Sequence, residues 1–137
     1  MKSLLAAGFR LPQKSILLST GPPRTKARLL ESVRRLENLG FDLYATSGTA
    51  KFLKENGVKM TLLRWPSELK EPNSATYLTQ RRIDLVINIP KSFETEEVMN
   101  DYQIRRRAVE FGIPIITNPE LVMALVDALE KPVPLNL

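Results

Sequence analysis

Four small polar residues in succession, Thr46, Ser47, Gly48 and Thr49, separate an apolar run from an amphipathic one. Their hydroxyls can donate to the oxygens of a phosphate or carboxylate, and the glycine lets a ligand approach the backbone closely. If a helix begins here, its first N–H groups and the positive end of its dipole also favour an anion. The same residues suit a plain helix cap formed by Ser47 or Thr49, and the turn alone does not separate the two interpretations.

Further candidate ligands follow other apolar runs. Ser19, Trp65 and Asn88 each end such a run, although Trp65 also suits a core position and Asn88 a local turn. Arg105 begins a run of three arginines in an amphipathic stretch. Successive helical positions fan out over most of a turn, so at most one or two of these arginines can face a single pocket. A solvated basic face is the favoured interpretation of the run.

Composition narrows the possible chemistry. The 137 residues include no cysteine and no histidine, which excludes disulfides and argues against a hydrolase triad or a zinc site. Twenty Lys and Arg against fifteen Asp and Glu give a net charge of +5, spread along the chain, which favours an anionic partner. We therefore expect a small anionic ligand, with no metal, no cofactor, no nucleic acid and no membrane as partners.

Short β-branched apolar runs alternate with amphipathic stretches along the chain. They predict strands at 15–20, 41–46, 59–65, 83–90 and 114–118, and helices at 23–40, 49–57, 75–82, 95–111 and 119–131. This alternation predicts an α/β fold in which helices cover both faces of a parallel sheet. Ligands of such sheets bind beyond the carboxyl ends of the strands, where the candidate residues would meet.

Several segments, in order, resemble the methylglyoxal-synthase-like domain that closes the large chain of carbamoyl phosphate synthetases. They are "LLAAGFRLPQK", "FDLYATSGTAKFL", "RWPSE", "IDLVINIP" and "DYQIRRRAVEFGIPIITN". The resemblance implies a three-layer α/β/α fold with a five-stranded parallel sheet in the order 3-2-1-4-5. It divides the chain into a linker remnant at 1–12, an effector-binding domain at 13–131 and a tail at 132–137. The lead-in segment implies that the chain is a fragment of a longer polypeptide.

The same resemblance implies a regulatory role, in which this domain binds an effector and shifts the activity of catalytic domains elsewhere. The implied partners are the other domains of the large chain and its small glutaminase subunit, in the cytoplasm. Thr46 and Thr49 match the family's anion-holding hydroxyls, and Asn88 matches its strand-four asparagine. Trp65 matches the position that contacts N-acetylglutamate in the urea-cycle type, whereas bacterial relatives that bind uridine or purine monophosphates have a lysine there.

Two further positions depart from the acetylglutamate-responsive type, because Lys91 and Asp101 stand where it carries asparagines. The effector class therefore stays open between a nucleotide such as UMP, UTP or IMP and a dicarboxylate such as N-acetylglutamate. The predicted effector-binding residues are Ser19, Thr46, Ser47, Gly48, Thr49, Trp65, Asn88, Lys91, Asp101 and Arg105.

Methylglyoxal synthases resemble this chain at the threonine-rich turn, but they place a Gly-Gly-Asp segment after the third strand and use a histidine. Here the corresponding loop reads "WPSELKEPNS", and histidine is absent. Proton abstraction beside a carbonyl needs a positioned base and an electrophile for the enolate oxygen. We expect no catalytic residue in this domain. A docking module with a vestigial pocket is the alternative interpretation.

Overall fold

A computed structural model describes residues 15–21, 23–89 and 95–130. The predicted site residue Lys91 and the predicted linker and tail at 1–12 and 132–137 lie outside these residues. Within them, one sheet contains the parallel strands β1 (Ser15–Thr20), β2 (Asp42–Ala45), β3 (Thr61–Leu62), β4 (Leu85–Ile89) and β5 (Ile115–Ile116). Its strand order is β3-β2-β1-β4-β5, which confirms the predicted topology.

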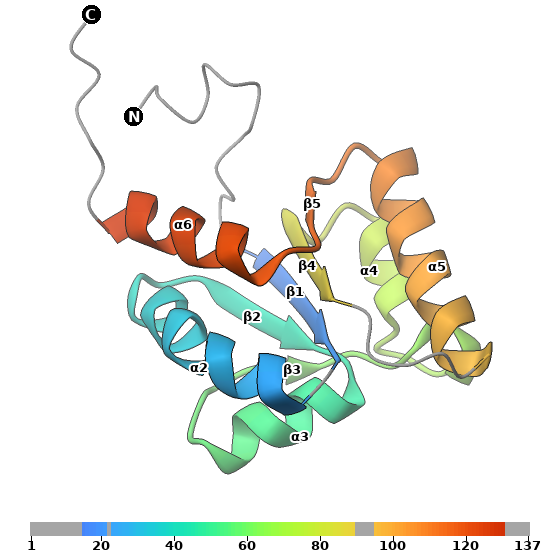
Figure 1. Ribbon diagram of the computed structural model, residues 1–137. Helices are drawn as coiled ribbons and strands as arrows, with labels where there is room; N and C mark the ends of the chain where they lie inside the picture. Colours follow the sequence, from blue (N-terminus) through green and yellow to red (C-terminus); the bar gives the residue numbers. More distant parts are fainter. Residues whose placement is uncertain (1–14, 22, 90–94, 131–137) are drawn as a thin grey trace, which may run out of the picture.

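Helices cover both faces of this sheet (Figure 1). They are α2 (Pro23–Asn38), α3 (Ser47–Glu55), α4 (Ser74–Thr79), α5 (Thr95–Glu110) and α6 (Pro119–Glu130), with a short 3-10 helix, η1 (Pro66–Glu68). One core cluster joins the sheet to α2, α3 and α6, and the other joins it to α4 and α5. The three-layer α/β/α prediction is therefore confirmed. No helix among these described elements is long and apolar enough to cross a membrane.

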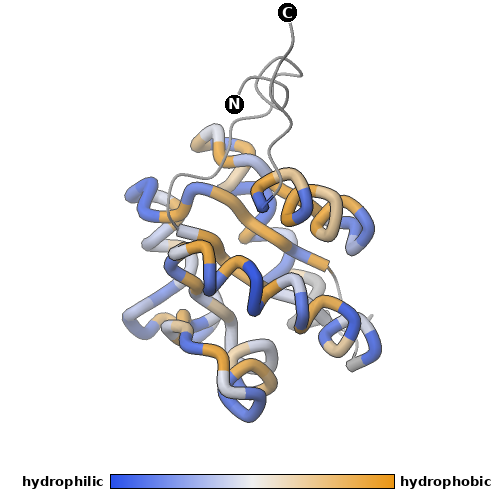
Figure 2. The backbone as a smooth tube through the Cα atoms, turned by 90° about the vertical axis from the view of Figure 1, so that its left-hand side faces the viewer, coloured by the Kyte–Doolittle hydropathy of each residue, from blue (hydrophilic) through white to orange (hydrophobic). Residues whose placement is uncertain are grey.

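The two central strands form the middle of both clusters. Ile16 and Leu18 of β1 point to the α2 face, whereas Leu17 between them points to the α5 face. All side chains of β4 are buried, because a parallel sheet with helices on both faces leaves neither face to solvent. Figure 2 shows these apolar strands enclosed between helices of mixed polarity. The carboxyl ends of these buried strands are where the candidate site residues were predicted.

Two of the differences from the predicted element boundaries lie next to the candidate site. The predicted strand 59–65 pairs with β2 only at Thr61 and Leu62, because Arg64 binds another segment instead. The Arg64 N–H donates to Pro72 O at 2.7 Å, and the Ser74 N–H donates to Arg64 O at 2.9 Å. Helix α3 begins at Ser47, two residues before the predicted start. This earlier start places Ser47, Gly48 and Thr49 together in its first turn.

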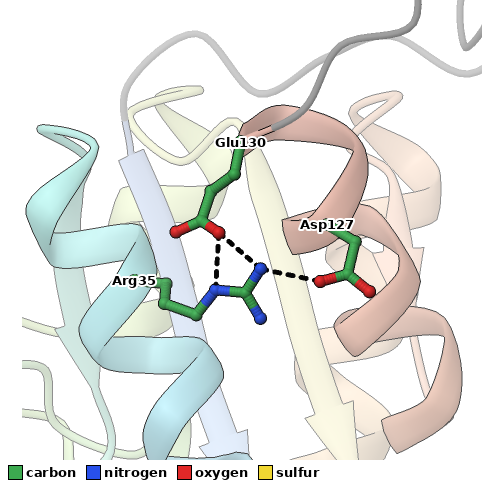
Figure 3. A network of polar contacts seen from close by, with 3 residues as sticks. All are labelled: Arg35, Asp127 and Glu130. Carbon is green, nitrogen blue, oxygen red and sulfur yellow. Dashed lines mark hydrogen bonds and ion pairs between the residues drawn. The ribbon is translucent and has the colours of Figure 1, made fainter.

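A polar network joins α2 to α6 at the end of the sheet opposite the strand arrowheads (Figure 3). Arg35 Nε donates to Glu130 Oε1 at 2.8 Å, and Arg35 Nη2 donates to Asp127 Oδ1 at 2.7 Å and to Glu130. The Glu130 carboxylate, followed by that of Asp127, raises the pKa of Arg35 above its ordinary value. The guanidinium therefore stays charged, and this network fixes helices far from the candidate site.

Candidate functional site

A cleft of about 130 Å³ is lined by residues at the carboxyl ends of β1, β2 and β4 and in the first turns of α2 and α3. Figure 1 shows the ends of β1 and β2 beside the starts of these two helices. It is lined by Ser19, Thr20, Gly21, Lys26, Thr46, Ser47, Gly48, Thr49, Trp65, Ile89 and Asp101. Pockets that enclose a whole small-molecule ligand usually exceed about 300 Å³. The described part of this cleft is therefore sized for the anionic group of a ligand rather than for a complete nucleotide.

The first turn of α3 lines the cleft with backbone N–H groups that have no acceptor among the described residues. Thr46 is the N-cap, and its side chain makes no capping hydrogen bond. The first helical bond runs from Ala50 N–H to Thr46 O at 2.7 Å, so the N–H groups of Ser47, Gly48 and Thr49 have no acceptor within the helix. The first turn also contains no acidic residue. The positive end of the helix dipole therefore faces the cleft without a carboxylate in its own first turn, and capping by Ser47 or Thr49 is not observed.

Thr46 and Ser19 form a buried hydroxyl pair in the cleft wall. Thr46 Oγ1 donates to Ser19 Oγ at 3.1 Å. A serine hydroxyl that accepts one bond still has its own O–H to donate. Ser19 is thus the hydroxyl of the pair that can donate to a ligand, with Thr46 orienting it.

Thr49 has a structural role that the sequence did not reveal. Its hydroxyl accepts from Thr20 N–H at 3.0 Å and donates to Thr20 O at 2.9 Å. This reciprocal pair is buried and ties the first turn of α3 to the end of β1. The expectation that the hydroxyls of Thr46 and Thr49 both point into the crevice as anion ligands therefore differs from the structure. Thr49 can contribute its backbone N–H to the cleft, while its side chain is used to hold the wall.

Lys26 brings a positive charge to the first turn of α3. A Cβ atom added at Gly48 would lie 3.5 Å from Lys26 Nζ. Gly48 is not among the residues with positive φ, so the backbone does not require glycine at this position. Its lack of a side chain instead leaves room beside the ammonium group. The sequence prediction missed Lys26; the available signal was a lysine near the start of the helix that follows the first strand.

Asn88 lies beneath the cleft rather than in its lining. Its Nδ2 donates to Asp101 Oδ1 at 3.0 Å, and both side chains are buried. Among the described residues, Asn88 Oδ1 has no hydrogen-bond partner. Asp101 is the one carboxylate among the described residues that line the cleft. The cleft therefore has a positive side at Lys26 and a negative side at Asp101, which Asn88 holds in place.

Trp65 forms another wall and is fixed by its neighbours. Its Nε1 donates to Ser47 Oγ at 3.2 Å, its N–H donates to Glu68 Oε1 at 2.7 Å, and its carbonyl accepts from Asn73 Nδ2 at 2.9 Å. The ring also packs against the core cluster on the α5 face. Trp65 thus packs against the core and also lines the cleft.

Arg105 is not brought to the cleft. It lies with Tyr102, Arg106, Val109 and Glu110 around a separate hollow on α5. Among the described residues, the predicted site residues that line the cleft are therefore Ser19, Thr46, Ser47, Gly48, Thr49, Trp65 and Asp101. Asn88 lies outside the lining and donates a hydrogen bond to Asp101. In this same part of the chain, no cluster of three or more acidic, histidine or cysteine side chains could hold a metal ion.

The fold and this strand-end cleft define a methylglyoxal-synthase-like domain, and the comparisons agree. The family model described as "MGS-like domain" matches residues 28–117, so the chain belongs to that family. Multifunctional protein URA2 of Saccharomyces cerevisiae is 38% identical over 145 residues, which cover 99% of this chain and 6% of that protein. The C-terminal section of the carbamoyl phosphate synthase large chain of Aquifex aeolicus is 40% identical over 130 residues, covering 95% of this chain and 24% of that protein.

A solved structure supports the fold. The methylglyoxal synthase from Elizabethkingia anophelis NUHP1 superimposes with a TM-score of 0.58 at 20% identity, covering 90% of this chain and 81% of that one. At this identity, the likeness concerns the fold alone. The chain spans only a small part of its multifunctional relatives, about 6% of URA2.

Proposed function

We propose that this chain is the regulatory domain of a carbamoyl phosphate synthetase large chain and binds the anionic group of a small effector in the cleft. The observation that carries the proposal is the uncapped first turn of α3, whose N–H groups have no acceptor among the described residues and line the same cleft as Lys26. Similarity to URA2 and to the Aquifex aeolicus large-chain section supports the assignment to a synthetase. The other domains of the large chain and its small glutaminase subunit are the proposed partners, in the cytoplasm.

In this proposal, the oxygens of a phosphate or carboxylate accept bonds from the N–H groups of Ser47, Gly48 and Thr49. The ammonium group of Lys26 neutralises the anion, and Ser19 O–H adds a further donor. Asp101 would accept a hydrogen bond from a second part of the same ligand. A dicarboxylate would bring its second negative charge toward Asp101, whereas a nucleotide offers hydroxyl and ring N–H donors. The cleft therefore favours a nucleotide over N-acetylglutamate.

The binding test is a melting experiment with UMP, UTP, IMP and N-acetylglutamate added separately. A ligand present at 100 times its dissociation constant raises the free energy of unfolding by about 2.7 kcal/mol, so at least one nucleotide should raise the melting temperature clearly. A docking module with a vestigial pocket would show no ligand-dependent stabilisation. That result with all four compounds would contradict the proposal.

Gly48→Ala provides a variant that separates binding from folding. Alanine should leave stability unchanged or raise it by roughly 0.5 to 1 kcal/mol, because Gly48 does not need its conformational freedom. The added methyl group beside Lys26 Nζ should weaken nucleotide binding about tenfold, measured by calorimetry. Gly112→Ala is the control: with φ of 70°, Gly112 should lose about 1 kcal/mol of stability and keep its affinity. If Gly48→Ala bound the nucleotide as tightly as the parent, the anionic group would not bind beside Gly48.

We also propose that this domain is not itself a catalyst. The sequence contains no histidine, and the loop after β3 has no Gly-Gly-Asp segment. Asp101, the carboxylate in the described cleft, is hydrogen-bonded by Asn88, and no imidazole is present to polarise a substrate carbonyl. Incubation with dihydroxyacetone phosphate should therefore yield methylglyoxal at the uncatalysed rate. Turnover that disappears in Asp101→Asn would show that the domain is an enzyme.

A further inference from the structure

A second and larger hollow runs between α3 and β3. We call it the lysine groove; its volume is about 620 Å³, and it is lined by Ser47, Ala50, Lys51, Lys54, Gly57, Val58, Lys59, Met60 and Leu62. Ser47 also lines the effector cleft, so the two hollows adjoin. The lysine groove shares no other lining residue with that cleft, and the function proposed above makes no use of it.

The rim of the lysine groove is positively charged. Lys51, Lys54 and Lys59 are all exposed, and Lys51 and Lys54 lie one turn apart on α3. The ion pairs found among the described residues involve arginines and none of these lysines. The Glu37 carboxylate approaches the groove only to accept from Lys59 N–H at 2.8 Å. An occupant of this groove should therefore be acidic.

One side of the groove is an edge of the sheet that the described residues leave uncovered at Met60 and Leu62. Strand β3 is the outermost strand, and alternate residues of a parallel strand bond to opposite neighbours. The Leu63 N–H bonds inward to Ala45 O at 2.9 Å, whereas Arg64 bonds outward to the segment 72–74. The backbone groups of Met60 and Leu62, in alternation with Leu63, therefore also point outward, next to the lysines. The segment 72–74 covers this edge at Arg64 but not at Met60 and Leu62.

The floor of the groove is apolar. Ala50 and Val58 are buried, and Met60 and Leu62 pack half-buried against the same core cluster. An extended peptide places alternate side chains on opposite sides, so apolar residues can meet this floor while acidic residues meet the lysines. The groove lining contains no aromatic side chain on which a nucleic-acid base could stack. These features favour a peptide over a nucleic acid.

We propose that the lysine groove binds an extended segment of a partner protein, with alternating acidic and apolar residues, which adds as a strand to the open edge of β3. Main-chain hydrogen bonds to Met60 and Leu62 would hold the segment, and its carboxylates would pair with Lys51, Lys54 and Lys59. The alternative explanation is that the lysines only protect the edge of the sheet from pairing with other chains. If that is their only role, the groove should not bind such a peptide.

The test uses the chain labelled with ¹⁵N and the synthetic peptide acetyl-Glu-Val-Glu-Val-Glu-Val-Glu-amide. Addition of the peptide should shift the amide signals of Met60 and Leu62 and slow their hydrogen exchange. The charge-reversed variant Lys51→Glu/Lys54→Glu should bind about tenfold more weakly, because exposed pairs are lost and repulsion replaces them. Lys70→Glu, an exposed lysine outside the groove, is the matched control and should bind like the parent.

Two altered peptides make the test specific. The same peptide with lysine in place of glutamate should not bind, and a peptide N-methylated at alternate residues should lose the strand hydrogen bonds and bind at least about tenfold more weakly. The proposal would be overturned if either altered peptide bound as tightly as the original peptide, or if the original peptide caused no shifts at Met60 and Leu62. It would also be overturned if oligo(dT) bound at the same lysines more tightly than the original peptide. Nucleotide affinity of Lys51→Glu/Lys54→Glu should stay unchanged. A failure of peptide binding in the lysine groove would therefore leave the proposal for the effector cleft untouched.

Discussion

Thr49→Val should lower the free energy of unfolding by about 2 to 4 kcal/mol, although valine nearly preserves the shape of threonine. The Thr49 hydroxyl bonds both the N–H and the carbonyl of Thr20, at 3.0 and 2.9 Å. Valine would leave both buried backbone groups without a partner, and each such loss costs about 1 to 3 kcal/mol. Urea denaturation of parent and variant measures the difference.

Thr49→Ser is the matched control, because serine keeps the hydroxyl and removes one methyl group. It should cost about 1 kcal/mol, the value of a buried methyl group. If Thr49→Val were as stable as Thr49→Ser, the hydroxyl would not hold α3 to β1. In that case Thr49 could instead serve as a direct ligand of the anion, as the sequence suggested.

Lys26→Met should weaken binding of the nucleotide effector about 10- to 100-fold. One charge-assisted hydrogen bond contributes roughly 1.5 to 3 kcal/mol, which corresponds to this range. Methionine keeps most of the apolar stem of lysine, so the packing of that stem should be retained. Affinity is measured by calorimetry at two salt concentrations, and the parent should lose more affinity than the variant when salt is raised.

Arg105→Met is the control for Lys26→Met, because Arg105 is a cation that the structure places at a separate hollow. Its replacement should leave nucleotide affinity within about twofold of the parent, since a distant exposed charge is screened. An equal loss of affinity in both variants would indicate a general electrostatic effect. A loss in Arg105→Met alone would move the binding site to α5.

Much of the fold could be predicted because local patterns report it. The run "IDLVINIP" is apolar on both sides of a strand, and the structure buries all of β4 on both faces. The amphipathic pattern at 23–40 likewise predicted a helix, and the structure buries Leu29, Val33 and Leu36 of α2 in the core. The short strands β3 and β5 were predicted too long, because pairing at a sheet edge depends on which neighbour is present. For β3, the competing neighbour is the segment 72–74, which binds Arg64.

The meeting place of most candidate residues followed from the sequence as well. The carboxyl ends of parallel strands meet at one edge, so the turn 46–49, Ser19 and Trp65 were expected together, and all of them line the cleft. The roles of the side chains there did not follow. The partner of a threonine hydroxyl depends on which atoms of another strand lie beside it. Here the Thr46 hydroxyl donates to the Ser19 hydroxyl, whereas the Thr49 hydroxyl donates to the Thr20 carbonyl.

Charge at the site was decided by tertiary structure alone. Lys26 comes from a different helix, and no spacing within the turn 46–49 could reveal an ammonium group beside Gly48. Asp101 and Arg105 are one helical turn apart, yet only Asp101 lines the cleft. A turn of helix advances about 5.4 Å, and Arg105 lies instead beside a separate hollow on α5. The sequence by itself determined the sheet, its helices and the position of the polar turn, because periodicity and strand ends are local properties. Only the packing of α2 and α5 against the sheet decided which charges face that turn, because helix position along a sheet is not encoded in local spacing.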